Sequence, residues 1–91
     1  MKRRVSFRAS GRVQGVGFRA WAQDEAERLG VNGWIRNRSN GEVEGVAEGP
    51  ATSVDAFVAW CAHGPRGARV EGCEVRDEVY VGDLMGFEIR R

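Results

Sequence analysis

The stretch VNGWIRNRSNGEVEGVAEG, residues 31–49, decides the fold. It holds two strand-like runs, residues 31–38 and 42–48, with Asn40-Gly41 between them. Asn-Gly between two such runs is the strongest short-range signal for a β-hairpin, so these strands are expected to be antiparallel neighbours. Acidic side chains recur on one face of the second run, and we expect this face to point outward: Glu42, Glu44 and Glu48.

A strand and a helix precede the hairpin. In residues 4–13 apolar and polar side chains alternate, which predicts a half-buried strand with Val5, Phe7 and Ala9 inward. After a glycine-rich connection, apolar residues recur at helical spacing from Phe18 to Leu29, and Gly30 stands where a helix C-cap glycine belongs.

A second helix and two more strands follow it. Pro50 suits the first turn of a helix, whose apolar face is Val54, Phe57, Val58 and Cys61. Residues 69–76 read as a strand whose alternation slips at Gly72, which predicts a β-bulge. Residues 86–91 form a short last strand with Phe87 and Ile89 inward.

The resulting order is βαββαβ with a small final strand, which predicts an α+β, ferredoxin-like sandwich. We expect one domain over residues 1–91, with a mainly antiparallel sheet and two helices on one face. The crossover through the first helix makes the first and second strands parallel. Val13 and Asn37 therefore end two strands at the same edge, roughly 10 Å apart with one hairpin strand between them.

Composition excludes several classes of protein. With 42% hydrophobic and 30% charged residues, the chain is typical of a globular protein. It has no apolar run of membrane length and no secretory signal. We therefore expect a cytoplasmic protein. Cys61 and Cys73 are expected to be free thiols, and no metal site is expected because no set of ligands has the spacing for one.

Charge is unevenly distributed along the chain. Residues 1–40 carry nine Lys or Arg against three Asp or Glu, whereas residues 41–91 carry five against ten. A locally positive surface near the first glycine-rich turn would attract a small anion. The acidic second half argues against nucleic acid as a partner.

The segment GRVQGVGFR, residues 11–19, connects the first strand to the first helix. Its glycines are compatible with a tight turn. They are also compatible with a cradle whose amides converge on an anion at the helix N-terminus, where Arg19 could grip two oxygens. No Gly-Lys-Ser/Thr follows and the glycine spacing is not that of a dinucleotide-binding loop.

This segment and GWIRNRSNGEVEGVAEG, residues 33–49, closely resemble the two signature segments of acylphosphatases. The similarity extends over nearly the whole chain, although residues 66–86 match loosely and the chain ends in Arg-Arg rather than an aromatic residue. In that family the loop binds phosphate through main-chain amides, an arginine holds the phosphoryl oxygens and an asparagine positions the attacking water.

The resemblance implies that the arginine is Arg19 and the asparagine Asn37. It assigns phosphate binding to the loop and the start of the helix: Val13, Gln14, Gly15, Val16, Gly17, Phe18 and Arg19. The implied activity is hydrolysis of a small acyl phosphate to a carboxylate and inorganic phosphate, without metal, cofactor or covalent nucleophile. A monomer with no nucleic-acid or membrane partner is expected.

Three other functions agree less well with the sequence. An RNA-binding sheet would need exposed aromatics on its central strands, but the outward set of the first strand is Arg4, Ser6, Arg8 and Ser10. A non-enzymatic domain of this type occurs inside larger carbamoyl-transferring proteins; a chain of 91 residues favours a free-standing enzyme. A regulatory ligand-binding domain would leave the presence of both Arg19 and Asn37 unexplained.

Overall fold

The predicted hairpin lies in the middle of a five-stranded sheet. The computed structural model describes residues 1–91, and its elements are β1 (Lys2–Arg12), α1 (Phe18–Leu29), β2 (Asn32–Asn37), β3 (Val43–Pro50), α2 (Ala51–Cys61), β4 (Arg69–Glu78) and β5 (Phe87–Ile89). The strand order is β4-β1-β3-β2-β5. All neighbours are antiparallel except β5, which runs parallel to β2. The predicted βαββαβ order and mainly antiparallel sheet are confirmed.

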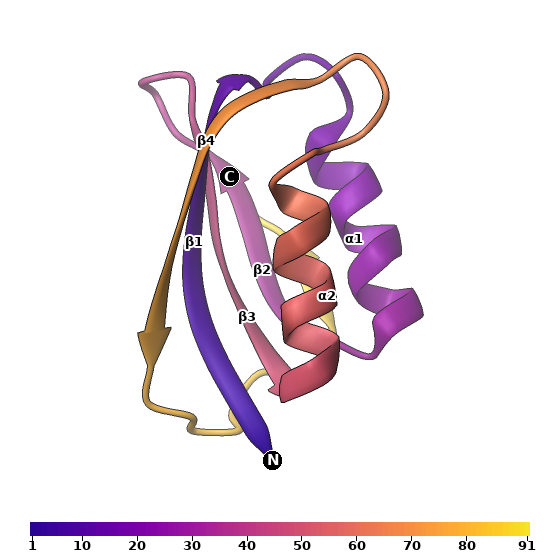
Figure 1. Ribbon diagram of the computed structural model, residues 1–91, viewed down its shortest axis with the longest axis vertical. Coiled ribbons are helices and arrows are strands. Elements are labelled where there is room, and N and C mark those ends of the chain that lie inside the picture. The colour runs from indigo at the N-terminus through magenta and orange to yellow at the C-terminus, as the bar shows by residue number, and fades with distance from the viewer.

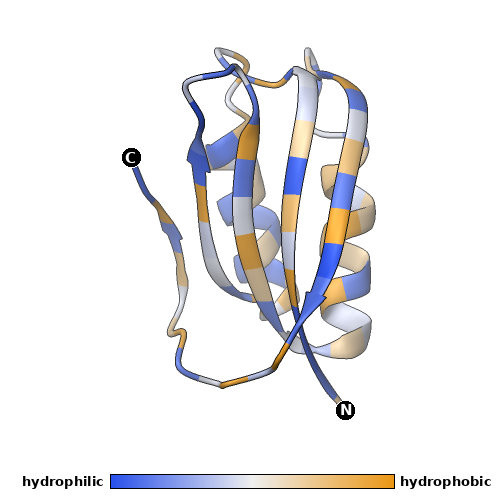
Figure 2. Cartoon of the chain, turned by 90° about the vertical axis from the view of Figure 1, so that its left-hand side faces the viewer, coloured by the Kyte–Doolittle hydropathy of each residue, from blue (hydrophilic) through white to orange (hydrophobic).

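Both helices pack on the same face of the sheet, as Figure 1 shows. The opposite face is open, and in Figure 2 its strands alternate between hydrophilic and hydrophobic residues. Neither helix has the length and apolarity needed to cross a membrane. Since β1 and β2 run in the same direction with β3 between them, their C-terminal ends emerge at one end of the sheet.

The core lies between the sheet and the helices. Its aromatic centre is Phe57 of α2, which packs against Phe7 of β1 and Phe87 of β5 with ring centroids 5.6 and 5.3 Å apart. Alternate residues of the strands complete it, including Val5, Ala9, Ile35, Val43 and Ala47. The alternation expected for β1 is therefore confirmed.

The slip in the alternation of β4 is a real irregularity of the sheet. Ser10 pairs with Gly72, but the next residue of β1, Gly11, pairs with Val70, so β4 has one extra residue, Glu71, at this point. This confirms the predicted bulge beside Gly72.

Glu48 corrects one expectation. It lies on the outer face of β3, but its side chain is buried beneath residues 79–86, the connection from β4 to β5. Its carboxylate accepts a hydrogen bond from the backbone N–H of Leu84 (3.1 Å) and lies 3.4 Å from the Arg4 guanidinium. Because a buried carboxylate needs such partners, Glu48 ties the connection to the sheet and so fixes where β5 begins.

Candidate active site

A pocket of about 220 Å³ lies where β1 and β2 end, between the glycine-rich loop and the first turn of α1. Its lining comes from the loop after β1 and from three elements, α1, β2 and β5: Val13, Gly15, Gly17, Phe18, Arg19, Ala20, Asn37 and Ile89. Arg19 and Asn37, 18 positions apart in the sequence, therefore line the same pocket. The parallel arrangement of β1 and β2 brings them together, as the topology predicted.

The loop presents a long run of free amides. No backbone N–H from Gln14 to Ala20 donates a hydrogen bond to another group of the protein; the first to do so is that of Trp21, which bonds to the Gly17 carbonyl (3.0 Å). An ordinary helix N-terminus leaves about four such donors free, and here the preceding loop extends the run. Backbone N–H groups gathered in this way favour an anion.

The start of α1 lacks the usual stabilising residues. Its N-cap position is Gly17, which makes no side-chain cap, and its first turn contains no acidic residue. That turn instead contains Arg19, whose positive charge is unfavourable at the positive end of the helix dipole. A bound anion would satisfy the free amides and the guanidinium at once.

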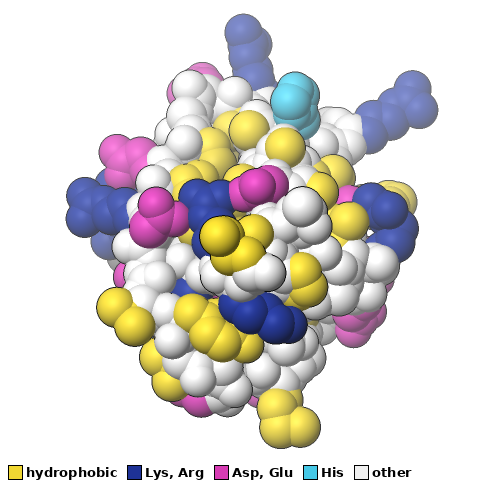
Figure 3. All heavy atoms as spheres, turned by 60° about the horizontal axis from the view of Figure 1, so that its bottom comes forward, with side chains coloured by type: hydrophobic (Ala, Val, Ile, Leu, Met, Phe, Trp, Pro, Cys, Tyr) yellow, Lys and Arg dark blue, Asp and Glu magenta, His cyan; other side chains and the backbone are white.

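Arg19 also differs from most arginines of the chain in having no acidic partner. The basic excess of residues 1–40 is largely neutralised because the strands align it with acids of residues 41–91, as in the pairs Arg3–Asp77 and Arg36–Glu44. Figure 3 likewise shows charges of both signs interspersed on the face it presents. Arg19 forms no ion pair, so its charge remains available to the pocket.

Asn37 contributes an unsatisfied acceptor. It is the last residue of β2 and lies on the same face as Ile35, so its side chain points to the helix side of the sheet. Its Oδ1 is buried and accepts no hydrogen bond. A buried acceptor without a partner costs about 1–3 kcal/mol and is uncommon in folded proteins, so this atom is suited to accept a hydrogen bond from a bound water.

Two of the predicted residues do not line the pocket. The Gln14 side chain points away and donates hydrogen bonds to the carbonyls of Arg38 (2.7 Å) and Glu42 (2.9 Å). The Val16 side chain packs against the hydrophobic core. Only their backbone amides could therefore serve the pocket, and Gln14 additionally joins the loop to the β2–β3 hairpin.

Ala20 and Ile89 line the pocket but were not predicted. Ile89 lies on the inner face of the sheet as expected, since it pairs with the fully buried Ile35, but it is 41% exposed rather than buried in the core. Because β5 is an edge strand, nothing covers the outer side of Ile89, whereas Phe87 is buried against Phe57. Only the position of β5 beside β2 could have revealed this.

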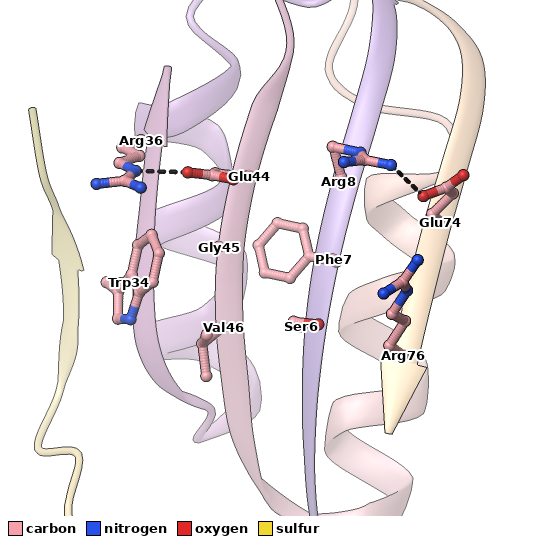
Figure 4. Close-up of a pocket in the computed structure, with 10 residues that line it drawn as sticks. All are labelled: Ser6, Phe7, Arg8, Trp34, Arg36, Glu44, Gly45, Val46, Glu74 and Arg76. Atoms are coloured by element: carbon pink, nitrogen blue, oxygen red, sulfur yellow. Dashed lines mark hydrogen bonds and ion pairs between the residues drawn. The ribbon is translucent and has the colours of Figure 1, made fainter. Parts of the chain in front are cut away.

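A separate hollow of about 280 Å³ lies on the open face of the sheet (Figure 4). Charged pairs occupy its rim: Arg36 lies 2.6 Å from Glu44, and Arg8 pairs with Glu74. These two arginines are already neutralised, which leaves Arg76 as the hollow's one arginine without an acidic partner, and the hollow shares no residue with the pocket at the strand ends. Its lining also contains two acidic side chains, so it is a weaker candidate for binding an anion.

The side chains most often used as nucleophile or base lie elsewhere. Cys61 is in the core, where burial raises the pKa of its thiol well above the ordinary value, and burial also raises the pKa of Cys73. His63 is exposed just beyond α2, with Nδ1 3.0 Å from the Ala59 carbonyl oxygen. Arg19 is consequently the only ionisable residue that lines the pocket.

The cradle can be tested by a pair of alanine substitutions. Gly15 and Gly30 have nearly the same left-handed backbone (φ 75° and 76°), and an added Cβ would meet nothing within 4 Å at either position. Gly15→Ala and Gly30→Ala should each lower the free energy of unfolding by about 1 kcal/mol. Gly15→Ala alone should weaken binding of inorganic phosphate, roughly tenfold, because the loop relieves its backbone strain by turning amides away from the anion. Equal phosphate affinity in the two variants would contradict the cradle.

Comparisons with known proteins agree on one family. The acylphosphatase family model matches residues 5–89. An acylphosphatase of Rubrobacter xylanophilus is 54% identical over 88 residues, 97% of this chain and 80% of that protein. Among solved structures, the acylphosphatase of Bacillus subtilis superposes with a TM-score of 0.93 at 34% identity, with both chains fully covered. Full-length HypF, solved in a phosphate- and nucleotide-bound form, gives a TM-score of 0.89 at 26% identity over 12% of its length.

Proposed function

We propose specific roles for the residues of the pocket, starting from the finding that this chain belongs to the acylphosphatase family. Acylphosphatases hydrolyse small acyl phosphates, and the protein is an enzyme of this type. The observation that carries the assignment of roles is the buried, unpartnered Oδ1 of Asn37, which shares a pocket with Arg19 and the free loop amides.

The phosphoryl group binds in the cradle. Backbone amides within residues 14–20 donate to its oxygens, and the Arg19 guanidinium, free of any acidic partner, donates two more hydrogen bonds. These donors are held by the loop and by α1 before the substrate arrives. They can therefore stabilise the charge that the phosphoryl oxygens carry in the transition state without reorganising.

Asn37 positions the attacking water. Its Oδ1 accepts a hydrogen bond from the water and directs the water oxygen toward phosphorus, and its Nδ2 can donate to a phosphoryl oxygen. The water oxygen forms a bond to phosphorus while the bond from phosphorus to the acyl oxygen breaks. The carboxylate leaves with that electron pair, and the water proton passes to a phosphoryl oxygen.

No side chain of the pocket is available as a general base. An amide is not basic enough to take a proton at neutral pH, and a guanidinium donates hydrogen bonds but accepts none. An acyl phosphate has a good leaving group, so positioning and charge stabilisation suffice and the substrate phosphate takes the proton. This reaction needs neither a metal nor a cofactor.

Phosphate release from benzoyl phosphate tests this proposal. The chain should hydrolyse it at the same rate with and without a chelator of divalent metals. The value of kcat should change by less than about twofold between pH 6.5 and 8, because the pocket contains no carboxylate, imidazole or thiol. Loss of activity with chelator, or a kcat that rises tenfold per pH unit, would contradict the mechanism.

We further infer that residues 1–91 act as one acylphosphatase-like domain, as a cytoplasmic monomer without a nucleic-acid partner. The pocket is built entirely from this chain, which is consistent with activity as a monomer. Light scattering of the active protein tests the oligomeric state. A purely regulatory domain would bind phosphate at the same site but release none from benzoyl phosphate.

A further inference from the structure

One wall of the pocket has no evident role in holding a phosphoryl group. Ala20, in the first turn of α1, and Ile89, on β5, line the pocket and have purely hydrocarbon side chains. Ile89 is 41% exposed, whereas Ile35, its partner on the same face of the neighbouring strand β2, is fully buried. An exposed, β-branched apolar side chain at the mouth of a pocket offers apolar surface that a ligand could cover.

Ile89 is held firmly in this position. The backbone N–H of Arg90 donates to the Ile35 carbonyl (2.8 Å), and that of Gly33 donates to the Gly86 carbonyl (2.8 Å), so β5 is bonded at both of its ends. On the helix side, the Gln23 side chain of α1 donates to the Phe87 carbonyl (2.9 Å). The position of Ile89 relative to the pocket therefore follows from the fold.

We propose that Ile89, with Ala20 beside it, binds the acyl group of the substrate and favours acyl phosphates with an apolar aryl or alkyl substituent. This inference rests on the proposed function, since the phosphoryl group must occupy the cradle first. The pocket of about 220 Å³ is smaller than the roughly 300–1,000 Å³ typical of a small-molecule site. It encloses the phosphoryl group, and the acyl substituent lies against the apolar wall at its mouth.

A different surface beside the pocket would favour another kind of substrate. A polar hollow shares Asn37 with the pocket but contains no hydrophobic residue, and its cationic lining is Arg36, Arg38 and Arg91. An acyl group lying there would need a second anionic group. Two of its three arginines are already paired with Glu44, which favours the apolar wall instead.

The test compares two substrates that differ in their apolar group. Acetyl phosphate carries only a methyl group, whereas benzoyl phosphate carries a phenyl ring that can cover Ile89. In Ile89→Thr, which keeps the β-branched shape but is more polar, the ratio of kcat/KM for benzoyl phosphate to that for acetyl phosphate should fall roughly three- to tenfold. Ile89→Val should keep the ratio within about twofold of the parent value, because it leaves most of the apolar surface.

Val75→Thr is the matched control. Val75 lies on β4, the other edge strand, and is similarly exposed at 38%. This substitution should leave the ratio unchanged, and inhibition by inorganic phosphate should be the same in all three variants. An unchanged ratio in Ile89→Thr, or an equal fall for both substrates, overturns the inference while the proposed function stands. If the parent chain hydrolyses neither substrate, the proposed function fails and this inference with it.

Discussion

Arg19→Ala is expected to lower kcat/KM for benzoyl phosphate by about 10³- to 10⁵-fold, the range found when an arginine is removed from a phosphoryl-transfer site. Arg19 is the only ionisable residue of the pocket and has no acidic partner, so no other cation can replace its charge there. Arg19→Lys should recover only a small part of the loss, because an ammonium cannot bind two oxygens through a planar fork. Steady-state kinetics of both variants measure the effect.

The control for this substitution is Arg76→Ala. Arg76 also forms no ion pair, but it lines the hollow on the open face of the sheet (Figure 4). Its removal should change kcat/KM by less than about twofold, since a remote surface charge affects mainly the encounter rate. A loss of similar size in Arg76→Ala and Arg19→Ala would mean that general attraction of anions, rather than direct contact, accounts for the role of Arg19.

Asn37→Ala is expected to lower kcat by about 10²- to 10³-fold and to leave inhibition by inorganic phosphate nearly unchanged. The reason is that Asn37 positions the water while the loop and Arg19 bind the phosphoryl group. The magnitude is that of removing one positioned hydrogen-bonding group from an active site. Because Oδ1 is buried without a partner, removing it should lower the free energy of unfolding by less than about 0.5 kcal/mol, or raise it.

Asn32 is a matched control on the same strand. Its Oδ1 accepts a hydrogen bond from the backbone N–H of Gly86 (3.1 Å), whereas Asn37 Oδ1 has no hydrogen-bond partner. Asn32→Ala should therefore lose about 1 kcal/mol of stability and keep its kcat. Urea denaturation should show lowered stability for Asn32→Ala but not for Asn37→Ala, and steady-state kinetics should show a lowered kcat for Asn37→Ala but not for Asn32→Ala. An Asn37→Ala variant that loses phosphate binding together with kcat would contradict the separate roles.

The strands and helices could be predicted because their signals are local. Alternation in β1, the Asn-Gly turn and the glycine after α1 each depend on a few neighbouring residues, and each was confirmed. The exact burial of particular residues could not be predicted. Glu48 and Ile89 occupy the faces that alternation assigns, but the connection over residues 79–86 buries the first, and the edge position of β5 exposes the second.

In the pocket, too, local signals predicted some features and tertiary contacts decided the others. The crossover through α1 and the hairpin in residues 31–49 predicted that β1 and β2 end at one edge of the sheet, and the resemblance to acylphosphatases implied Arg19 and Asn37 there; the structure places both in one pocket. Only the tertiary structure showed that Asn37 Oδ1 has no partner, that the Gln14 side chain points away and that Ile89 lines the pocket. Local patterns determine which face of an element a side chain takes. Whether that face is covered, and by what, depends on contacts between residues far apart in the chain, such as Ile35 with Ile89.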